Sequence, residues 1–290
     1  ALLLRNHILQ TFEDVLVASP DEVKPLMNFV IVGGGPTGVE LAGALAEMKK
    51  NVLPKDYPEK DFSKLNVYLI EGSPNTLNVM SDVAKKASQK YLEDLGVIVK
   101  TNSLVADYDG ETVTLKSGET IESKNLIWAA GVTGNLLEGI PTAHITRGNR
   151  LLVNRFNEVE GLPGVFALGD IASMSTPKYP NGHPQLANVA LNQAKNLGKN
   201  LKAKLKGKPE KEFEYYDKGS MATVGKRKAI VDLPKFSFKG RFAWFFWMFL
   251  HLMLILSVKN KLTIFINWMM SYFYNDSTLR VILDLKRKKD

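Results

Sequence analysis

The chain of 290 residues contains no cysteine, so disulfides, thiolate metal sites, iron–sulfur clusters and dithiol redox chemistry are all excluded. Its four histidines are scattered, and none forms the H-x-x-x-H or H-E-x-x-H pair of a zinc site, so no metal site is predicted. Long apolar runs are also scarce. The longest stretch without a charged residue, 242–258, has 17 residues, which is marginal against the about 20 that a membrane-spanning helix needs.

Acidic residues are few in the last third of the chain. Residues 1–194 carry a net charge of −5, whereas residues 195–290 carry +13, and together they give the +8 of the whole chain. Such an asymmetry indicates that the C-terminal part meets an anionic surface, either nucleic acid or lipid.

A glycine-rich turn organises the first half of the sequence. The apolar run Phe29–Val32 leads into this turn, and a helical pattern follows it. The turn has the G-x-G-x-x-G pattern of a dinucleotide fingerprint, with its glycines at Gly33, Gly35 and Gly38. The first permits the tight turn, the second lets the backbone approach a pyrophosphate, and the third lets helix and strand pack closely. The helix N-terminus then directs N–H groups at the phosphates.

An acidic residue, Glu71, closes the next apolar run, Val67–Ile70. In a Rossmann unit, a carboxylate at this position accepts hydrogen bonds from the adenosine ribose and favours NAD over NADP. Glu71 lies 33 residues beyond Gly38, further than the usual ~20, and the polar residues 51–64 between them are interpreted as an inserted loop.

Apolar periodicity and turn residues predict the remaining elements. Helices are expected over 2–17, 81–95 and 188–200, and a basic linker over 199–211. Short strands are expected over 97–100, 104–107, 112–115, 119–122, 126–131, 151–153 and 165–171. The pattern predicts an α/β fold whose first domain is a three-layer βαβ unit with a β-meander crossover. The strand that ends at Gly131 would pass beneath a bound nucleotide.

Two aromatic-rich apolar blocks, 242–258 and 262–274, dominate the C-terminal part, with Arg241, Lys259 and Lys261 at their edges. Helices that lie in a membrane interface have this composition, with Trp and Tyr at headgroup depth and basic residues on anionic lipid. We therefore expect residues 240–285 to contact a membrane surface. Nucleic-acid binding is disfavoured, because the aromatic residues form continuous blocks and not single platforms between basic residues.

Several motifs together resemble the type II, single-subunit, non-proton-pumping NADH:quinone oxidoreductases, within the FAD- and NAD-dependent pyridine nucleotide-disulfide oxidoreductase-like superfamily. The likeness covers nearly the whole chain. It rests on the entry helix Leu4-Arg5-Asn6…Phe12-Glu13, Gly33-Gly-Gly-Pro-Thr-Gly-Val-Glu40, Glu71, Trp128-Ala-Ala-Gly-Val132, Leu168-Gly-Asp170-Ile-Ala, a quinone-site helix and the apolar C-terminal region. The resemblance implies a Rossmann-type NADH-binding domain, part of a second, FAD-binding Rossmann domain, and a C-terminal helical membrane-anchoring module.

The resemblance also implies roles for individual residues. NADH would be held by Gly33, Gly35, Gly38 and Glu71, and FAD by Gly169 and Asp170. Glu40 would lie near the contact between flavin and nicotinamide, although a carboxylate near a helix start also favours the helix dipole. The quinone helix of the family carries A-Q-x-A-x-Q; here it reads Ala187-Asn188-Val-Ala-Leu-Asn192-Gln193, so asparagines replace both glutamines. Because Asn is one methylene shorter, we expect an altered headgroup preference or compensation by Gln193.

By this resemblance the chain divides into four parts: 1–27, an entry helix and remnant of the FAD domain; 28–140, the NADH domain; 141–205, the FAD-domain part with the quinone helix; and 206–290, the anchor. It looks like a C-terminal fragment, since nothing in residues 1–27 supplies the first FAD-binding glycine motif. The implied reaction passes hydride from NADH to FAD and two electrons to menaquinone or ubiquinone. It would take place on the cytoplasmic face of a bacterial inner membrane or the matrix face of an organelle. The sequence does not decide whether the protein forms a homodimer.

Two alternatives stay open from the sequence. One is a flavin-dependent NADH reductase of the ferredoxin-reductase or apoptosis-inducing-factor type, with a protein or oxygen as electron acceptor. The other is a membrane-bound, non-catalytic NAD sensor, which the missing FAD-binding glycine motif and the two asparagine replacements both favour.

Overall fold

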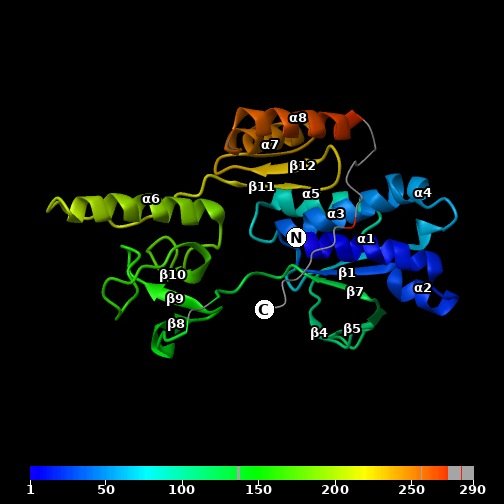
Figure 1. Ribbon diagram of the computed structural model, residues 1–290, viewed down its shortest axis with the longest axis horizontal. Helices are drawn as coiled ribbons and strands as arrows, with labels where there is room; N and C mark the ends of the chain where they lie inside the picture. The colour runs from blue at the N-terminus through cyan, green and yellow to red at the C-terminus, as the bar shows by residue number, and fades with distance from the viewer. Residues whose placement is uncertain (136–137, 256, 274–281, 283–290) are drawn as a thin grey trace. The chain divides into compact units, whose positions relative to one another are not determined.

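The computed structural model describes residues 1–135, 138–255, 257–273 and 282, and it divides the chain into two compact units (Figure 1). The first unit combines residues 1–130 with 218–290, and the second contains residues 131–217.

A parallel four-stranded sheet forms the centre of the first unit, with strand order β3-β2-β1-β7. Its strands are β1 (Asn28–Val32), β2 (Asn66–Ile70), β3 (Ile98–Lys100) and β7 (Asn125–Trp128). The register pairs Val32 with Ile70 on one side and with Trp128 on the other, so the carboxyl ends of β2, β1 and β7 lie at one edge of the sheet. Because β1 is central, its five residues are all buried.

Helices cover one face of this sheet: α1 (Leu2–Val17), α2 (Pro20–Leu26), α3 (Pro36–Asn51), α4 (Leu53–Asp56) and α5 (Asp82–Asp94). Alternate β1 residues point to opposite faces, and Phe29 and Ile31 pack against α1, α3 and α5. Their neighbours Val30 and Val32 pack against Val113, in a separate antiparallel meander on the other face. The meander consists of β4 (Val105–Tyr108), β5 (Thr112–Leu115) and β6 (Thr120–Glu122). The predicted three-layer unit with a meander crossover is confirmed.

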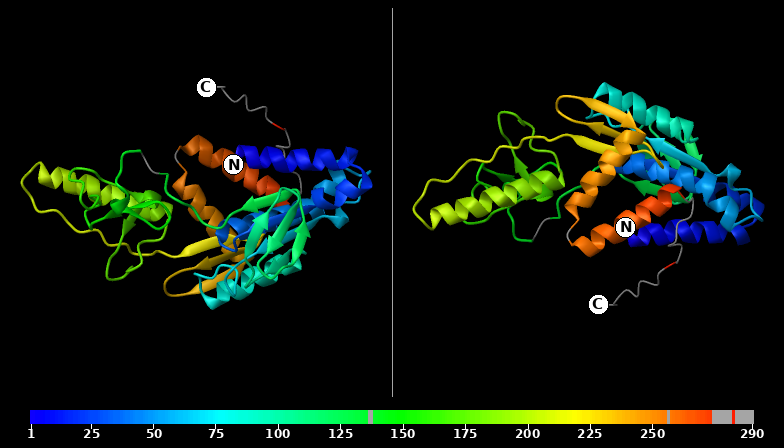
Figure 2. Two further views of the ribbon diagram at one scale, coloured as in Figure 1. Left: turned by 90° about the horizontal axis from the view of Figure 1, so that it is seen from below. Right: turned by 90° about the horizontal axis from the view of Figure 1, so that it is seen from above.

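The C-terminal part of this unit adds an antiparallel sheet and two helices (Figures 1 and 2). They are β11 (Ser220–Thr223), β12 (Ala229–Asp232), β13 (Ser237–Gly240), α7 (Arg241–Leu254) and α8 (Val258–Phe273). Strand β12 is buried on both faces: Ile230 joins the core formed by α3 and α5, whereas Ala229 and Val231 pack against α7. Between β11 and β12, the turn at Gly225 touches α3 so closely that a Cβ on Gly43 would lie 2.7 Å from the Gly225 nitrogen.

The second unit contains a small sheet and one long helix. The sheet has strands β8 (Ile145–Thr146), β9 (Arg150–Val153) and β10 (Ala172–Met174) in the order β10-β9-β8, and the helix is α6 (Ala187–Lys204). Short 3-10 turns lie at Thr142–His144 and Gly169–Ile171.

Several local predictions are wrong. The predicted strand 165–171 contains only an isolated bridge at Phe166 and the 3-10 turn that begins at Gly169, because this glycine has a φ of +67°. The predicted loop 51–64 contains α4 and a further 3-10 turn, Phe62–Lys64, and α6 extends into the predicted linker as far as Lys204. The antiparallel sheet at 220–240 was not predicted.

Among the described residues, most of the first apolar block lies in α7, and the second block lies in α8. Among the residues that the structure describes, no helix combines the length and apolar content needed to cross a bilayer. The predicted contact region 240–285 extends beyond the described residues at its C-terminal end.

Candidate active site

The glycine-rich turn lies at the carboxyl edge of the parallel sheet, between β1 and α3. Gly33 has a φ of +110°, and a Cβ on it would lie 2.7 Å from the Ala129 carbonyl oxygen, just after β7. A Cβ on Gly38 would lie 1.9 Å from the Gly33 carbonyl oxygen. No other residue type fits either position without movement of the backbone, so both glycines are required by the fold of the turn.

Gly35 differs from these two glycines because nothing lies within 4 Å of a Cβ built on it. It forms the N-cap of α3, and no side chain caps this helix end. The fold therefore does not require glycine here, and the turn leaves open space beside the unbonded N–H groups of the first helical turn. A nucleotide pyrophosphate fits this arrangement, which combines close backbone approach with hydrogen-bond donors.

Glu71 follows β2 at the same sheet edge, and its carboxylate is tied to the glycine turn. One oxygen accepts the Gly34 N–H at 2.5 Å, and the other accepts the Ser73 N–H at 2.6 Å. Each oxygen keeps a second lone pair, so the carboxylate can still accept a ribose hydroxyl. The structure therefore brings Gly33, Gly35, Gly38 and Glu71 together, as the sequence predicted. Gly131 follows β7 with a φ of +90° and is exposed.

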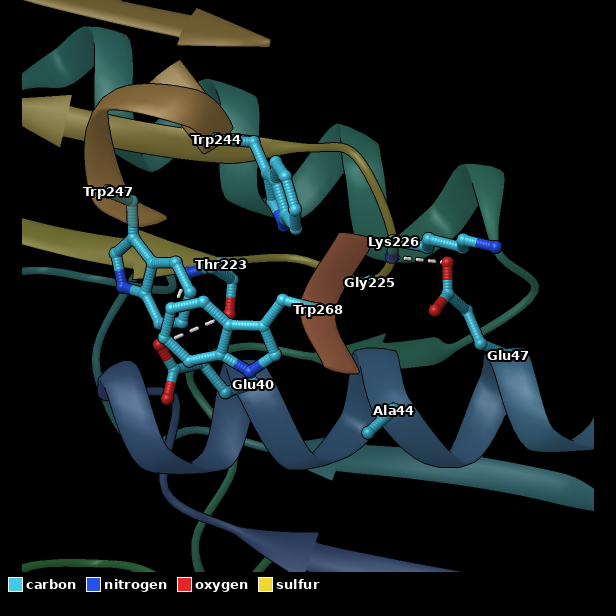
Figure 3. Close-up of a pocket in the computed structure, with 9 residues that line it drawn as sticks. All are labelled: Glu40, Ala44, Glu47, Thr223, Gly225, Lys226, Trp244, Trp247 and Trp268. Carbon is cyan, nitrogen blue, oxygen red and sulfur yellow. Dashed lines mark hydrogen bonds between the residues drawn. The ribbon is translucent and has the colours of Figure 1, made fainter. Parts of the chain in front are cut away.

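Glu40, the fifth residue of α3, faces the C-terminal sheet. Its Oε1 accepts hydrogen bonds from the Thr223 N–H at 3.1 Å and from the Thr223 hydroxyl at 3.3 Å (Figure 3). Sequence reasoning missed Thr223, because strand β11 carries no motif that identifies it. The carboxylate therefore links α3 to β11, and its predicted place beside the nicotinamide stays a prediction.

The second unit brings Gly169, Asp170 and Gln193 together. The Gly169 N–H donates to Gln193 Oε1 at 2.7 Å, and a Cβ on Gly169 would lie 2.9 Å from the Ala190 Cβ. Asp170 is exposed, and its backbone oxygen accepts from Gln185 Nε2 at 2.9 Å. The exposed carboxylate can accept hydrogen bonds from ribityl hydroxyls, so this turn fits the predicted contact with FAD.

The predicted quinone helix is the first part of α6, and its polar residues have different environments. Ala187 and Asn188 are exposed, and Asn192 donates from Nδ2 to the Asn188 backbone oxygen at 2.7 Å. Gln193 is 1% exposed and holds the Gly169 turn. Its amide is therefore a positioning group for Gly169 and Asp170, while Asn188 and Asn192 lie on the accessible side of the helix.

Truncation of Gln193 should loosen the Gly169 turn. We expect Gln193→Ala to lower the free energy of unfolding of the second unit by about 2–3 kcal/mol, because the Gly169 N–H loses its acceptor and a cavity remains. Denaturant unfolding measures the loss, and amide hydrogen exchange should show faster exchange at Gly169. Lys195→Ala, on the exposed side of the same helix, is the matched control. Unchanged exchange at Gly169 would contradict the assignment.

A buried histidine, His183, should make the stability of the second unit depend on pH. His183 is 2% exposed, neither ring nitrogen has a hydrogen-bond partner among the described residues, and its ring packs against Tyr179, Phe213 and Tyr215 at centroid distances of 4.9–6.3 Å. Burial lowers the pKa of His183; the nearby Glu214 carboxylate opposes this shift, and Arg150 and Arg155 add to it. The neutral imidazole is therefore the folded form.

The second unit should lose stability as the pH falls through the pKa of an unfolded histidine, near 6.5, because the unfolded chain then binds a proton that the folded one excludes. At pH values below both the folded and the unfolded pKa of His183, the free energy of unfolding falls by about 1.4 kcal/mol for each pH unit by which folding lowers this pKa. Thermal unfolding between pH 7.5 and 5.5 measures the effect. His183→Phe keeps an aromatic ring and should make the unfolding temperature depend less on pH. If the unfolding temperatures of the two proteins change equally with pH, His183 is not the group responsible.

Taken together, the sheet order, the glycine turn and the carboxylate after β2 define a Rossmann-type nucleotide-binding protein. A family model described as pyridine nucleotide-disulphide oxidoreductase matches residues 4–194, and one described as NDH2 C-terminal domain matches residues 217–275. The chain therefore belongs to the pyridine nucleotide-disulphide oxidoreductase family and, within it, to the type II NADH dehydrogenases.

Individual relatives agree with this assignment. The chain is similar to two curated proteins of Mycobacterium tuberculosis, the type II NADH:quinone oxidoreductases Ndh (33% identity) and NdhA (34% identity). Each alignment covers 94% of this chain and 60% of the relative, so the chain spans about 60% of the length of these relatives. Among solved structures, NDH2 from Plasmodium falciparum in complex with NADH has a similar fold, with a TM-score of 0.82 at 21% identity, over 94% of this chain and 71% of that one.

Proposed function

We propose that the chain forms the NADH-binding and membrane-facing parts of an FAD-dependent NADH:quinone oxidoreductase. One combination of features carries the proposal: an open glycine turn with a carboxylate beside it, in the same unit as a C-terminal module that matches the NDH2 C-terminal domain. Relatives named as type II NADH:quinone oxidoreductases support the same activity.

NADH binding is assigned to the first unit. The pyrophosphate approaches Gly35 at the N-terminus of α3, and Glu71 accepts the adenosine ribose hydroxyls and disfavours a 2′-phosphate by charge repulsion. Gly33 and Gly38 maintain the turn. Glu40 is assigned to the nicotinamide side of the site.

FAD binding is assigned to the Gly169-Asp170 turn, with Gln193 as the group that positions it. FAD supplies the redox chemistry, since an isoalloxazine ring can take up a hydride and release two electrons to a quinone. Overall, NADH, one proton and the quinone yield NAD⁺ and the quinol. Ala187, Asn188 and Asn192 are assigned to the quinone side, where the shorter asparagines alter the preference for the headgroup.

Membrane association is assigned to α7 and α8. Side chains more than half exposed form an apolar surface, here called the outer face: Phe242, Phe249, Met253, Leu254, Val258, Leu262, Ile266, Met270 and Phe273. Arg241 and Lys259 are exposed at the ends of these helices, where they can meet anionic headgroups. The helices lie flat in the interface, with the outer face in the acyl boundary. We assign the protein to the cytoplasmic face of a bacterial inner membrane or the matrix face of an organelle.

The reductase alternative with a protein acceptor is not favoured, because the C-terminal match is to the NDH2 domain. The test uses the full natural protein in lipid vesicles. NADH should reduce a menaquinone or ubiquinone analogue, the purified protein should show a flavin absorption band, and NADPH should react much more slowly. Reduction of ferredoxin but not of quinone would support the alternative, and a protein without a flavin band would support a sensor.

A further inference from the structure

A cavity of about 440 Å³ lies between α3 and the C-terminal module, wholly within the first unit. Nine residues line it: Glu40, Ala44, Glu47, Thr223, Gly225, Lys226, Trp244, Trp247 and Trp268. Three of the four tryptophans of the chain therefore border one space. Its volume falls in the range of small-molecule sites.

The lining combines indole rings with carboxylates. Figure 3 shows the three tryptophans grouped over the Glu40 end of α3, while Lys226 lies with Glu47 at the other end. Trp247 and Trp268 lie 5.2 Å apart at 37°, so they form one corner of the cavity. Aromatic faces carry negative electrostatic potential and attract cations, particularly where a carboxylate stands beside them.

Lys226 does not fill the tryptophan end. It is the only basic residue of the nine that line the cavity, its backbone N–H donates to Glu47, and its side chain lies at that end. One aromatic residue of this module already contacts a cation: the Arg227 guanidinium lies 4.6 Å from the centre of the Tyr272 ring on α8.

We propose that this cavity binds an ammonium headgroup, with the tryptophan rings around the cation and Glu40 as its counter-ion. The group would belong to a zwitterionic phospholipid or to a soluble alkylammonium compound. A lipid source fits the position of the cavity beneath α7 and α8, whose outer face is apolar. This proposal goes beyond the proposed function. It shares Glu40 with the assigned nicotinamide side of the NADH site, but the binding tests below contain neither NADH nor quinone, so they can fail or succeed independently of that function.

The first experiment uses tryptophan fluorescence in a Trp128→Phe background. Trp128 is 61% exposed and lies outside the cavity, so its removal leaves only cavity tryptophans as fluorophores. Choline should change the emission saturably, and its neutral isostere 3,3-dimethyl-1-butanol should bind at least about tenfold more weakly, because it lacks the charge. Equal responses to both compounds would show a merely apolar cavity and overturn the proposal.

Variants then locate the site. Glu40→Gln should weaken choline binding about tenfold, and Glu47→Gln should weaken it less, since Glu47 lies at the end of the cavity away from the tryptophans. Glu59→Gln, an exposed carboxylate elsewhere in the first unit, is the matched control and should bind as before. Circular dichroism checks that each variant is folded. If Glu40→Gln binds choline as tightly as the control, the assignment is wrong.

Vesicles separate the two sources. Phosphatidylcholine vesicles should give a fluorescence change that Glu40→Gln reduces, whereas phosphatidylglycerol vesicles should give only a change that the variant leaves intact. Saturable choline binding without the Glu40-dependent response to phosphatidylcholine would assign the site to a soluble alkylammonium. The absence of both responses would overturn the proposal.

Discussion

Gly38→Ala will cost the protein both its stability and its NADH binding. The added Cβ would lie 1.9 Å from the Gly33 carbonyl oxygen, so the start of α3 must move away from the turn after β1. We expect the free energy of unfolding to fall by about 2–4 kcal/mol, as for other overpacked sites, and NADH affinity to fall on the order of 100-fold. Denaturant unfolding and NADH titration by fluorescence measure the two effects.

Gly35→Ala separates these two losses. Its Cβ meets nothing in the folded protein, so stability should remain within about 0.5 kcal/mol of the parent. NADH affinity should nevertheless fall about tenfold, because the methyl group occupies the space where the pyrophosphate approaches. Gly198→Ala, at an open position inside α6, is the control and should affect neither NADH binding nor folding adversely. Unchanged NADH binding in Gly35→Ala would contradict the assigned pyrophosphate site.

The second large effect concerns the outer face of α7 and α8. Replacement of Phe249 and Ile266 by serine should reduce partition into anionic vesicles on the order of 100-fold, because each side chain contributes roughly 1.5–3 kcal/mol when it leaves water. Both are more than half exposed, so the fold should be retained. Vesicle cosedimentation measures the partition, with circular dichroism as the check on folding.

Val79→Ser supplies the matched control for this experiment. Val79 is 92% exposed in the same unit but belongs to neither α7 nor α8, so vesicle binding should not change. Trp244 is a poor choice for such a test, since it is 9% exposed and packs into the module. If the double serine variant binds vesicles as the parent does, the outer face is not the membrane-contact surface.

The sequence was most informative where a single local conformation is required. The glycine turn needs residues without a Cβ at Gly33 and Gly38, and the spacing alone therefore identified β1, the start of α3 and the carboxyl edge of the sheet. Glu71 was predictable for the same reason, since it ends the next apolar strand. By contrast, residues 165–171 are as apolar as a buried strand, so composition predicts a strand there. The turn that is found instead depends on the positive φ of Gly169.

Contacts between distant segments could not be predicted from the sequence. Thr223 meets Glu40 across 183 residues, and the four-residue strands β11, β12 and β13 lack the alternation that would reveal them. The apolar block of α7 is uniform in character, so composition indicates an apolar helix but not which side is buried. Only packing against β12 separates the buried Trp244 from the exposed Phe249.

Strand β12 is a wall shared by two cores, because Ile230 belongs to one and its neighbours Ala229 and Val231 to the other. The C-terminal module therefore cannot be detached as a separate adapter: its removal would expose the helical layer of the nucleotide domain to water. Strand β12 also connects the two cores by direct contact. Strand β12 packs against α7, and the Gly225 turn that precedes β12 packs against Gly43 of α3, the helix whose N-terminus is assigned to the nucleotide. The proposed membrane surface and the glycine turn are thus connected by continuous packing within one unit.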